Sequence, residues 1–122
     1  MIVYLDNSAT TKVYDEVAEK MTAVMTEHYG NPSSLHTVGL EAEKLLKEAR
    51  KTIASVFGAD DKEIVFTSGG TESDNMAIVG AYKSKKRESN HIITTTIEHP
   101  AVLETVKALE DQGARVTYIL EP

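Results

Sequence analysis

The sequence predicts an α/β fold in which two long helices precede a partial parallel sheet. Apolar residues recur at helical spacing in the first half of the chain, and short apolar runs alternate with helical segments after Gly58. The order strand–helix–strand–helix–strand, with short connections, is typical of parallel strands joined by crossover helices. We therefore expect a three-strand βαβαβ unit with two preceding helices.

The first half of the chain contains the two long helices. Residues 2–5 are a short apolar run that predicts a strand or an extended arm. A helix is predicted after this run and should end near Gly30. Its apolar residues recur at helical spacing and share one face: Val13, Val17, Met21, Val24 and Met25. The second helix should run from about Val38 to Phe57, where Gly58 supplies a natural end.

The second half of the chain contains the predicted strands. Residues 64–66 predict a short buried strand that leads into a glycine-containing loop and a helix through about Tyr82. The other two strands are expected at residues 92–96 and 116–120, which are rich in β-branched and aromatic residues. Between them, Pro100 can occupy the first turn of a helix.

Composition excludes several classes of protein. The 122 residues carry a net charge of −6, which argues against a general nucleic-acid binder, since such a protein needs a basic face. With no cysteine, the chain has neither a disulfide framework nor a thiolate metal site, and we expect no metal. The N-terminus lacks the apolar length of a signal peptide or a membrane span, so we expect a cytoplasmic protein.

The predicted sheet is unusually small for its type. A parallel sheet normally has more strands and is covered by helices on both faces. The last predicted strand also ends close to Pro122, where the next connection would begin. We therefore expect these residues to be the front part of a larger protein.

The loop at residues 68–71 is the first candidate site. The first N–H groups of a helix lack intrahelical partners and favour an anion, and the two glycines let a phosphate approach the backbone. The Ser68 and Thr71 hydroxyls are further donors. The same residues also fit ordinary N-capping, with Thr71 and Asp74 as an approximate capping box, so both interpretations stay open. Glu72 would repel a bound dianion and has to point away from it.

Three other segments are candidates on weaker grounds. His99 follows a predicted strand, and ligands of parallel sheets bind beyond the carboxyl ends of the strands. Its imidazole could stack on an aromatic ring or move a proton, or simply cap the next helix. Residues 29–36 and 6–11 are explained as a turn and a polar loop without any function.

Taken together, four segments strongly resemble the cysteine desulfurases of the NifS/IscS type. These enzymes belong to the class V aminotransferase group of pyridoxal-phosphate enzymes, within fold type I. The segments are residues 4–11, 30–36, 67–75 and 98–102. The resemblance covers the whole chain. It implies that residues 14–122 are an incomplete cofactor-binding large domain and that residues 1–13 are an arm belonging to the small domain.

The resemblance also implies roles for individual residues. In that family, the residues matching Gly70 and Thr71 hold the phosphate of pyridoxal 5′-phosphate. The histidine matching His99 stacks on the pyridine ring, and as a catalytic residue it could shuttle protons between cofactor and substrate. Asn31 and His36 match a segment near the active-site entrance, which makes them substrate-proximal.

The implied reaction converts L-cysteine to L-alanine and leaves persulfide sulfur on the enzyme. The resemblance further implies that the sulfur passes to an acceptor protein, either an iron–sulfur scaffold or a tRNA-thiolation protein, and that the enzyme is a homodimer. The family's Schiff-base lysine, pyridine-nitrogen aspartate and persulfide cysteine lie outside these residues, so we expect the residues alone to be inactive. Two alternatives stay open: another class V enzyme, such as a selenocysteine lyase or an aminotransferase, or a non-catalytic phosphate-binding or interaction domain.

Overall fold

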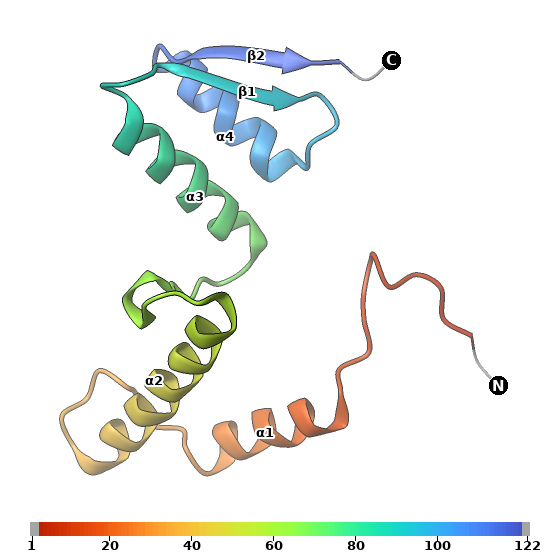
Figure 1. Cartoon of the computed structure of the whole chain (residues 1–122). Coiled ribbons are helices and arrows are strands. Elements are labelled where there is room, and N and C mark those ends of the chain that lie inside the picture. The colour runs from red at the N-terminus through yellow and green to blue at the C-terminus, as the bar shows by residue number, and fades with distance from the viewer. Residues whose placement is uncertain (1–2, 121–122) are drawn as a thin grey trace. The chain divides into compact units, whose positions relative to one another are not determined.

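The computed structural model describes residues 3–120 and divides into two compact units between Ile64 and Val65. The first unit contains two α-helices, α1 and α2, and one short 3-10 helix, η1. The second unit contains α3, β1, α4 and β2 in that order (Figure 1). The prediction that helices fill the first half of the chain and that strands and helices alternate in the second half is therefore confirmed.

Both helices predicted for the first unit are present. Helix α2 spans Thr37–Phe57, close to the prediction, whereas α1 spans Asp15–Thr26 and ends before the predicted end near Gly30. Gly58 ends α2 in the left-handed conformation, with φ of 63°, which is the role that the sequence predicts for it. The 3-10 helix η1, Asp61–Glu63, follows, and a capping box between Asp60 and Glu63 caps its N-terminus.

Two glycines make the connection between α1 and α2 possible. A Cβ atom at Gly30 would lie 2.3 Å from the carbonyl oxygen of Val38, and one at Gly39 would lie 2.3 Å from the carbonyl oxygen of Ser34. Both contacts are to backbone atoms, so no side-chain movement could relieve them. The turn between the helices therefore requires glycine at both positions.

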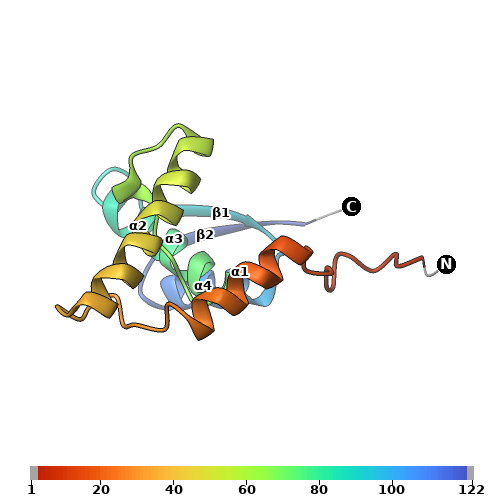
Figure 2. The same ribbon diagram turned by 90° about the horizontal axis from the view of Figure 1, so that it is seen from below.

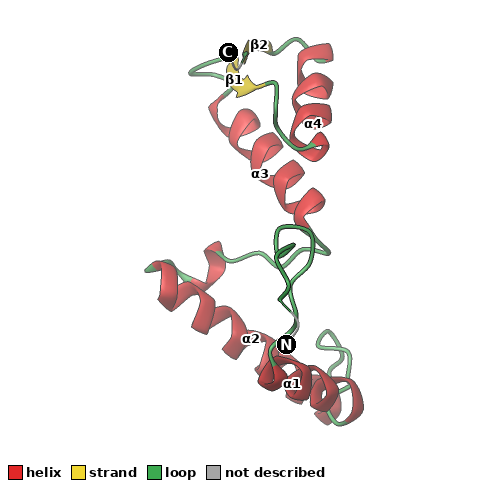
Figure 3. Ribbon diagram, turned by 90° about the vertical axis from the view of Figure 1, so that its right-hand side faces the viewer, coloured by secondary structure: helices red, strands yellow, loops and turns green. Residues whose placement is uncertain are grey.

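The second unit is a two-stranded parallel ladder with two helices. Helix α3 spans Gly70–Lys85, β1 spans His91–Thr95, α4 spans Pro100–Asp111 and β2 spans Arg115–Ile119. The strands run side by side (Figure 2), with His91 opposite Arg115 and Thr95 opposite Ile119. Both helices lie on one side of this ladder (Figures 1 and 3). The crossover from β1 through α4 to β2 confirms the predicted parallel connection.

The prediction of a third strand is wrong. Residues 64–66 form no strand, and β1 and β2 are the only strands among residues 3–120. Val65 and Phe66 are 61% and 43% exposed, so neither belongs to the buried core of the described residues. A strand needs a hydrogen-bonded neighbour, which an apolar sequence pattern does not report. Residues 3–5 are likewise irregular, and residue 2 lies outside the described residues.

The core of the second unit forms where the two helices meet the ladder. Tyr82, Leu109 and Ala114 are buried together, with four partly buried apolar side chains packed around them: Ile78, Val79, Ile92 and Val116. Residue Asn90 fixes the polar edge of this core. Its side chain accepts a hydrogen bond of 2.6 Å from the Tyr82 hydroxyl and donates one of 2.8 Å to the carbonyl oxygen of Gly113.

Two negative findings apply to residues 3–120. No helix there is long and apolar enough to cross a membrane. No group of histidine and acidic side chains in the same range is arranged to hold a metal ion.

Truncation of the buried Leu109 side chain tests the core. Leu109 is 2% exposed, so Leu109→Ala should lower the free energy of unfolding by about 2–5 kcal/mol, as measured by denaturant titration. Leu120 is 75% exposed and supplies the matched control, and Leu120→Ala should change the stability by less than about 0.5 kcal/mol. Equal effects of the two substitutions would contradict the described core.

Candidate functional site

The N-terminus of α3 lies at the candidate phosphate loop. Gly69 is the N-cap residue of this helix, and no side chain of the described chain caps it. The alternative interpretation, a capping box formed by Thr71 and Asp74, is therefore wrong. The helix begins two residues earlier than a Thr71 cap would require, because Gly70 already occupies the first helical position.

The space in front of this helix end is open. A Cβ atom at Gly69 or Gly70 would meet no described heavy atom within 4 Å, apart from its chain neighbours and its own helix. The first N–H groups of an α-helix have no intrahelical acceptor, and the helix dipole makes this end favourable for negative charge. The backbone at residues 70–72 can therefore approach an anion without displacing protein atoms.

Glu72 and Ser68 form a contact that the sequence pattern did not indicate. One carboxylate oxygen, Oε2, accepts hydrogen bonds from the backbone nitrogen of Ser68 at 2.6 Å and from its Oγ at 2.8 Å. These bonds lower the pKa of the Glu72 carboxyl below its ordinary value, and the backbone N–H contributes most. The Ser68 hydroxyl, which the sequence predicts as a further donor to a phosphate, donates to Glu72 in this structure.

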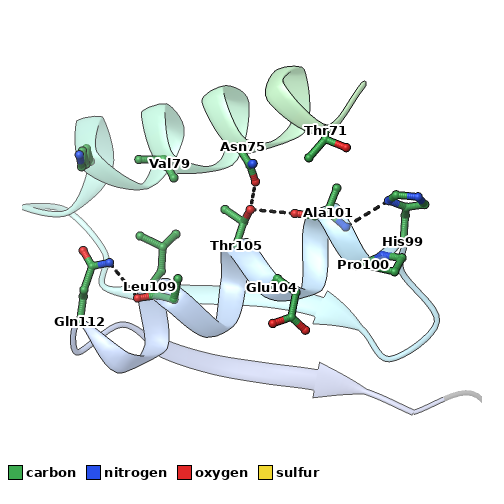
Figure 4. A pocket seen from close by; sticks show the side chains of 12 residues that line it. Thr71, Asn75, Val79, His99, Pro100, Ala101, Glu104, Thr105, Leu109 and Gln112 are labelled. Atoms are coloured by element: carbon green, nitrogen blue, oxygen red, sulfur yellow. Dashed lines mark hydrogen bonds between the residues drawn. The ribbon is translucent and has the colours of Figure 1, made fainter. Parts of the chain in front are cut away.

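His99 stands at the first position beyond the turn that follows β1. It is the N-cap residue of α4, and its Nδ1 accepts a hydrogen bond of 3.1 Å from the backbone nitrogen of Ala101 (Figure 4). Pro100 occupies the first turn, as the sequence predicts. Because Nδ1 is an acceptor, the neutral imidazole carries its proton on Nε2.

A polar link joins α3 to α4 between these two helix ends. The Thr105 hydroxyl on α4 hydrogen-bonds to the side-chain oxygen of Asn75 on α3, and it lies 2.7 Å from the carbonyl oxygen of Ala101 (Figure 4). Each partner is the sixth residue of its helix, about one and a half turns from the N-terminal end. The sequence analysis missed it, because 30 residues separate the partners and no local pattern marks such a pair.

Thr71 and His99 line one cavity of about 630 Å³ between α3 and α4. In Figure 4, the two helices run in the same direction and both residues lie at the N-terminal ends. The remaining lining residues come from the facing sides of the two helices: Asn75, Val79, Lys83, Pro100, Ala101, Glu104, Thr105, Ala108, Leu109 and Gln112. The sequence-based expectation that the glycine loop and His99 share one edge is consistent with this arrangement.

The donor set of this cavity suits a ligand with an anionic group and a flat ring. The open end of α3 offers backbone N–H groups and the Thr71 hydroxyl, which suit a phosphate. His99 offers an imidazole whose orientation is fixed by its bond to Ala101. Pyridoxal 5′-phosphate has both a phosphate and an aromatic ring, so the residues present fit the cofactor that the family resemblance implies.

Asn31 and His36 belong to the first unit and make local contacts. The Asn31 side-chain oxygen accepts a hydrogen bond of 2.9 Å from the backbone nitrogen of Ser33, which closes the turn. His36 caps α2, and its Nδ1 accepts from the backbone nitrogen of Gly39 at 3.2 Å. These contacts explain both residues structurally and leave their proximity to a substrate as a prediction.

Known proteins match the chain over nearly its whole length. The family model "Aminotransferase class-V" matches residues 3–121. A cysteine desulfurase of Trichormus azollae is 53% identical over 118 residues, which are 97% of this chain and 29% of that protein. The chain thus spans about 29% of the length of the curated relatives it matches.

Solved structures also match nearly the whole chain and about a third of their own length. The structure of a NifS-like protein superposes with a TM-score of 0.86 at 45% identity, covering 98% of this chain and 33% of that one. The structure of SspA in complex with cysteine superposes with a TM-score of 0.75 at 43% identity, covering 92% of this chain and 32% of that one. The chain therefore belongs to the pyridoxal-phosphate-dependent class V aminotransferase family and corresponds to the N-terminal portion of its cysteine desulfurases.

Proposed function

We propose that these residues are the N-terminal part of an enzyme that removes sulfur from L-cysteine with pyridoxal 5′-phosphate as cofactor. The observation that carries the proposal is the shared cavity: Thr71, at the open end of α3, and His99, at the start of α4, line the same space. In this proposal residues 14–122 belong to the cofactor-binding large domain, and residues 1–13 are an arm of the small domain.

Gly70 and Thr71 would hold the phosphate of the cofactor. The phosphate would accept hydrogen bonds from backbone N–H groups of the first turn of α3 and from the Thr71 hydroxyl. Gly70 has no side chain, so nothing of its own stands between the phosphate and these donors. When bound, the cofactor supplies an electron sink for charge that develops at the α-carbon of the substrate.

His99 would contact the ring of the cofactor. Its Nδ1 is occupied by the N–H group of Ala101, so the imidazole is held in one orientation at the start of α4. The other ring nitrogen, Nε2, is the atom that can donate or accept a proton in the cavity. His99 is therefore proposed as both a cofactor-binding and a catalytic residue.

The remaining assignments extend the proposal to the whole protein. Cysteine as substrate is supported by the relatives called cysteine desulfurases and by the SspA structure, which holds cysteine. Asn31 and His36 are proposed to lie near the substrate. The sulfur would pass to an iron–sulfur scaffold or a tRNA-thiolation protein, from a homodimer in the cytoplasm.

The reaction itself is tested on the full-length protein reconstituted with pyridoxal 5′-phosphate. It should turn yellow and form L-alanine from L-cysteine, with one sulfur released as sulfide per alanine when a reductant is present. Alanine production from selenocysteine alone would favour a selenocysteine lyase instead. A protein that stays colourless after reconstitution would contradict the proposal.

A carboxylate at position 70 tests the phosphate site. Gly70→Asp should weaken cofactor binding at least about tenfold, which corresponds to about 1.4 kcal/mol, because the new negative charge faces the phosphate. Gly80→Asp is the matched control: it adds the same charge to the same helix at a position that also has open space around it. A cofactor titration that gave equal affinities for the two variants would place the phosphate elsewhere.

Replacement of His99 separates its capping role from its role in the reaction. Asparagine is a good N-cap residue, so His99→Asn should keep the free energy of unfolding within about 0.5 kcal/mol of the wild type. His99→Ala should lose about 1 kcal/mol. Both variants should lower turnover at least about a hundredfold, because neither has an imidazole. Full turnover in His99→Asn would leave His99 with a structural role only.

A further inference from the structure

We propose that Glu72 is a positioning residue for the phosphate site: by binding Ser68, it holds the loop in the shape that leaves the first N–H groups of α3 free for the phosphate. The inference rests on the proposed function. It assigns Glu72 no contact with the cofactor, since its carboxylate is bonded to the residue that precedes the N-cap.

The geometry of the contact supports this role. A single oxygen of Glu72 accepts both donors of Ser68, the backbone N–H and the hydroxyl, at 2.6 and 2.8 Å. Ser68 lies immediately before Gly69, and Glu72 lies in the first turn of α3. The contact therefore spans the two glycines and closes the loop around them.

Glycines make such a contact necessary. Gly69 and Gly70 have no side chains that could pack, and glycine has more conformational freedom than any other residue. A second contact helps, because the Thr67 and Ser73 hydroxyls hydrogen-bond at 2.6 Å across the same loop. Two side-chain contacts thus order a segment that would otherwise sample many backbone conformations.

The ordering of the loop by Glu72 favours phosphate binding, whereas the negative charge of Glu72 disfavours it. Hydrogen bonds from Ser68 stabilise the ionised carboxylate, so the residue stays negatively charged at neutral pH. A negative charge in the first turn repels a dianion and competes for the favourable end of the helix dipole. Ordering of the loop and charge repulsion can be separated by substitution, since glutamine retains an acceptor oxygen and loses the charge.

The experiment measures the dissociation constant of pyridoxal 5′-phosphate for the full-length protein. Glu72→Ala should weaken binding at least about tenfold, which is about 1.4 kcal/mol. Glu72→Gln should bind within about threefold of the wild type, because its amide oxygen still accepts from Ser68. Pyridoxal, which lacks the phosphate, should show little difference among the three proteins.

A control variant and a second readout exclude a general effect on the helix. Glu88→Ala removes an exposed ion pair with Lys85 at the other end of α3 and should leave the affinity unchanged. Without cofactor, amide hydrogen exchange at Ser68 should be faster in Glu72→Ala than in the wild type or Glu72→Gln. This readout follows the contact itself and does not depend on activity.

Other outcomes overturn the proposal in distinct ways. Unchanged affinity in Glu72→Ala would show that Glu72 has no role in phosphate binding. Tighter binding in both variants would show that its charge opposes phosphate binding. An equal loss in Glu72→Gln and Glu72→Ala would contradict the role of the acceptor oxygen. Failure of the wild type to bind pyridoxal 5′-phosphate would remove the proposed function as well, whereas binding without any variant effect removes only this inference.

Discussion

The parallel pairing of β1 with β2 is the constraint on which the candidate site depends. Parallel neighbours cannot be joined by a tight turn, so the chain must cross over, and α4 makes that crossing. The crossover begins with His99, only four residues beyond the end of β1 at Thr95. Helix α3 packs against α4 and runs in the same direction, so its N-terminal end reaches the same cavity (Figure 4).

The two helix ends at this cavity are chemically different. His99 satisfies the first turn of α4 with its own side chain, so that end presents an imidazole. No side chain of the described residues caps α3, because its N-cap residue is Gly69, which has no side-chain acceptor. That end presents backbone N–H groups. A ligand with an anionic group and a flat ring can place the anion at the end of α3 and the ring against the imidazole at the end of α4. This match to both helix ends makes the cofactor proposal specific.

Local sequence patterns predicted the parts of the fold that local interactions determine. Helical periodicity placed α2 to within about one residue, and Gly58 ended it as expected. The rule for parallel sheets predicts the glycine loop and His99 at one edge of the sheet; Thr71 and His99 do line one cavity, although no strand precedes the loop in the described residues. The strand expected at residues 64–66 failed because strand formation depends on a neighbour that an apolar pattern does not identify.

Interactions between distant or competing partners could not be predicted in the same way. Thr105 and Asn75 are 30 residues apart, and nothing in either segment marks the other as its partner. Ser68 had several possible acceptors, and only the folded loop shows that Glu72 takes both of its donors. The capping box of Thr71 and Asp74 is wrong because α3 begins at Gly70, which places Thr71 inside the helix.

A crystal structure of the full-length protein with pyridoxal 5′-phosphate bound would test the central claim most directly. The account predicts a phosphate oxygen at roughly 3 Å from backbone nitrogens at Gly70 and Thr71, with the His99 imidazole against the face of the pyridine ring. The Glu72–Ser68 contact should persist in that structure. A phosphate bound away from the N-terminus of α3, or a ring out of contact with His99, would contradict it.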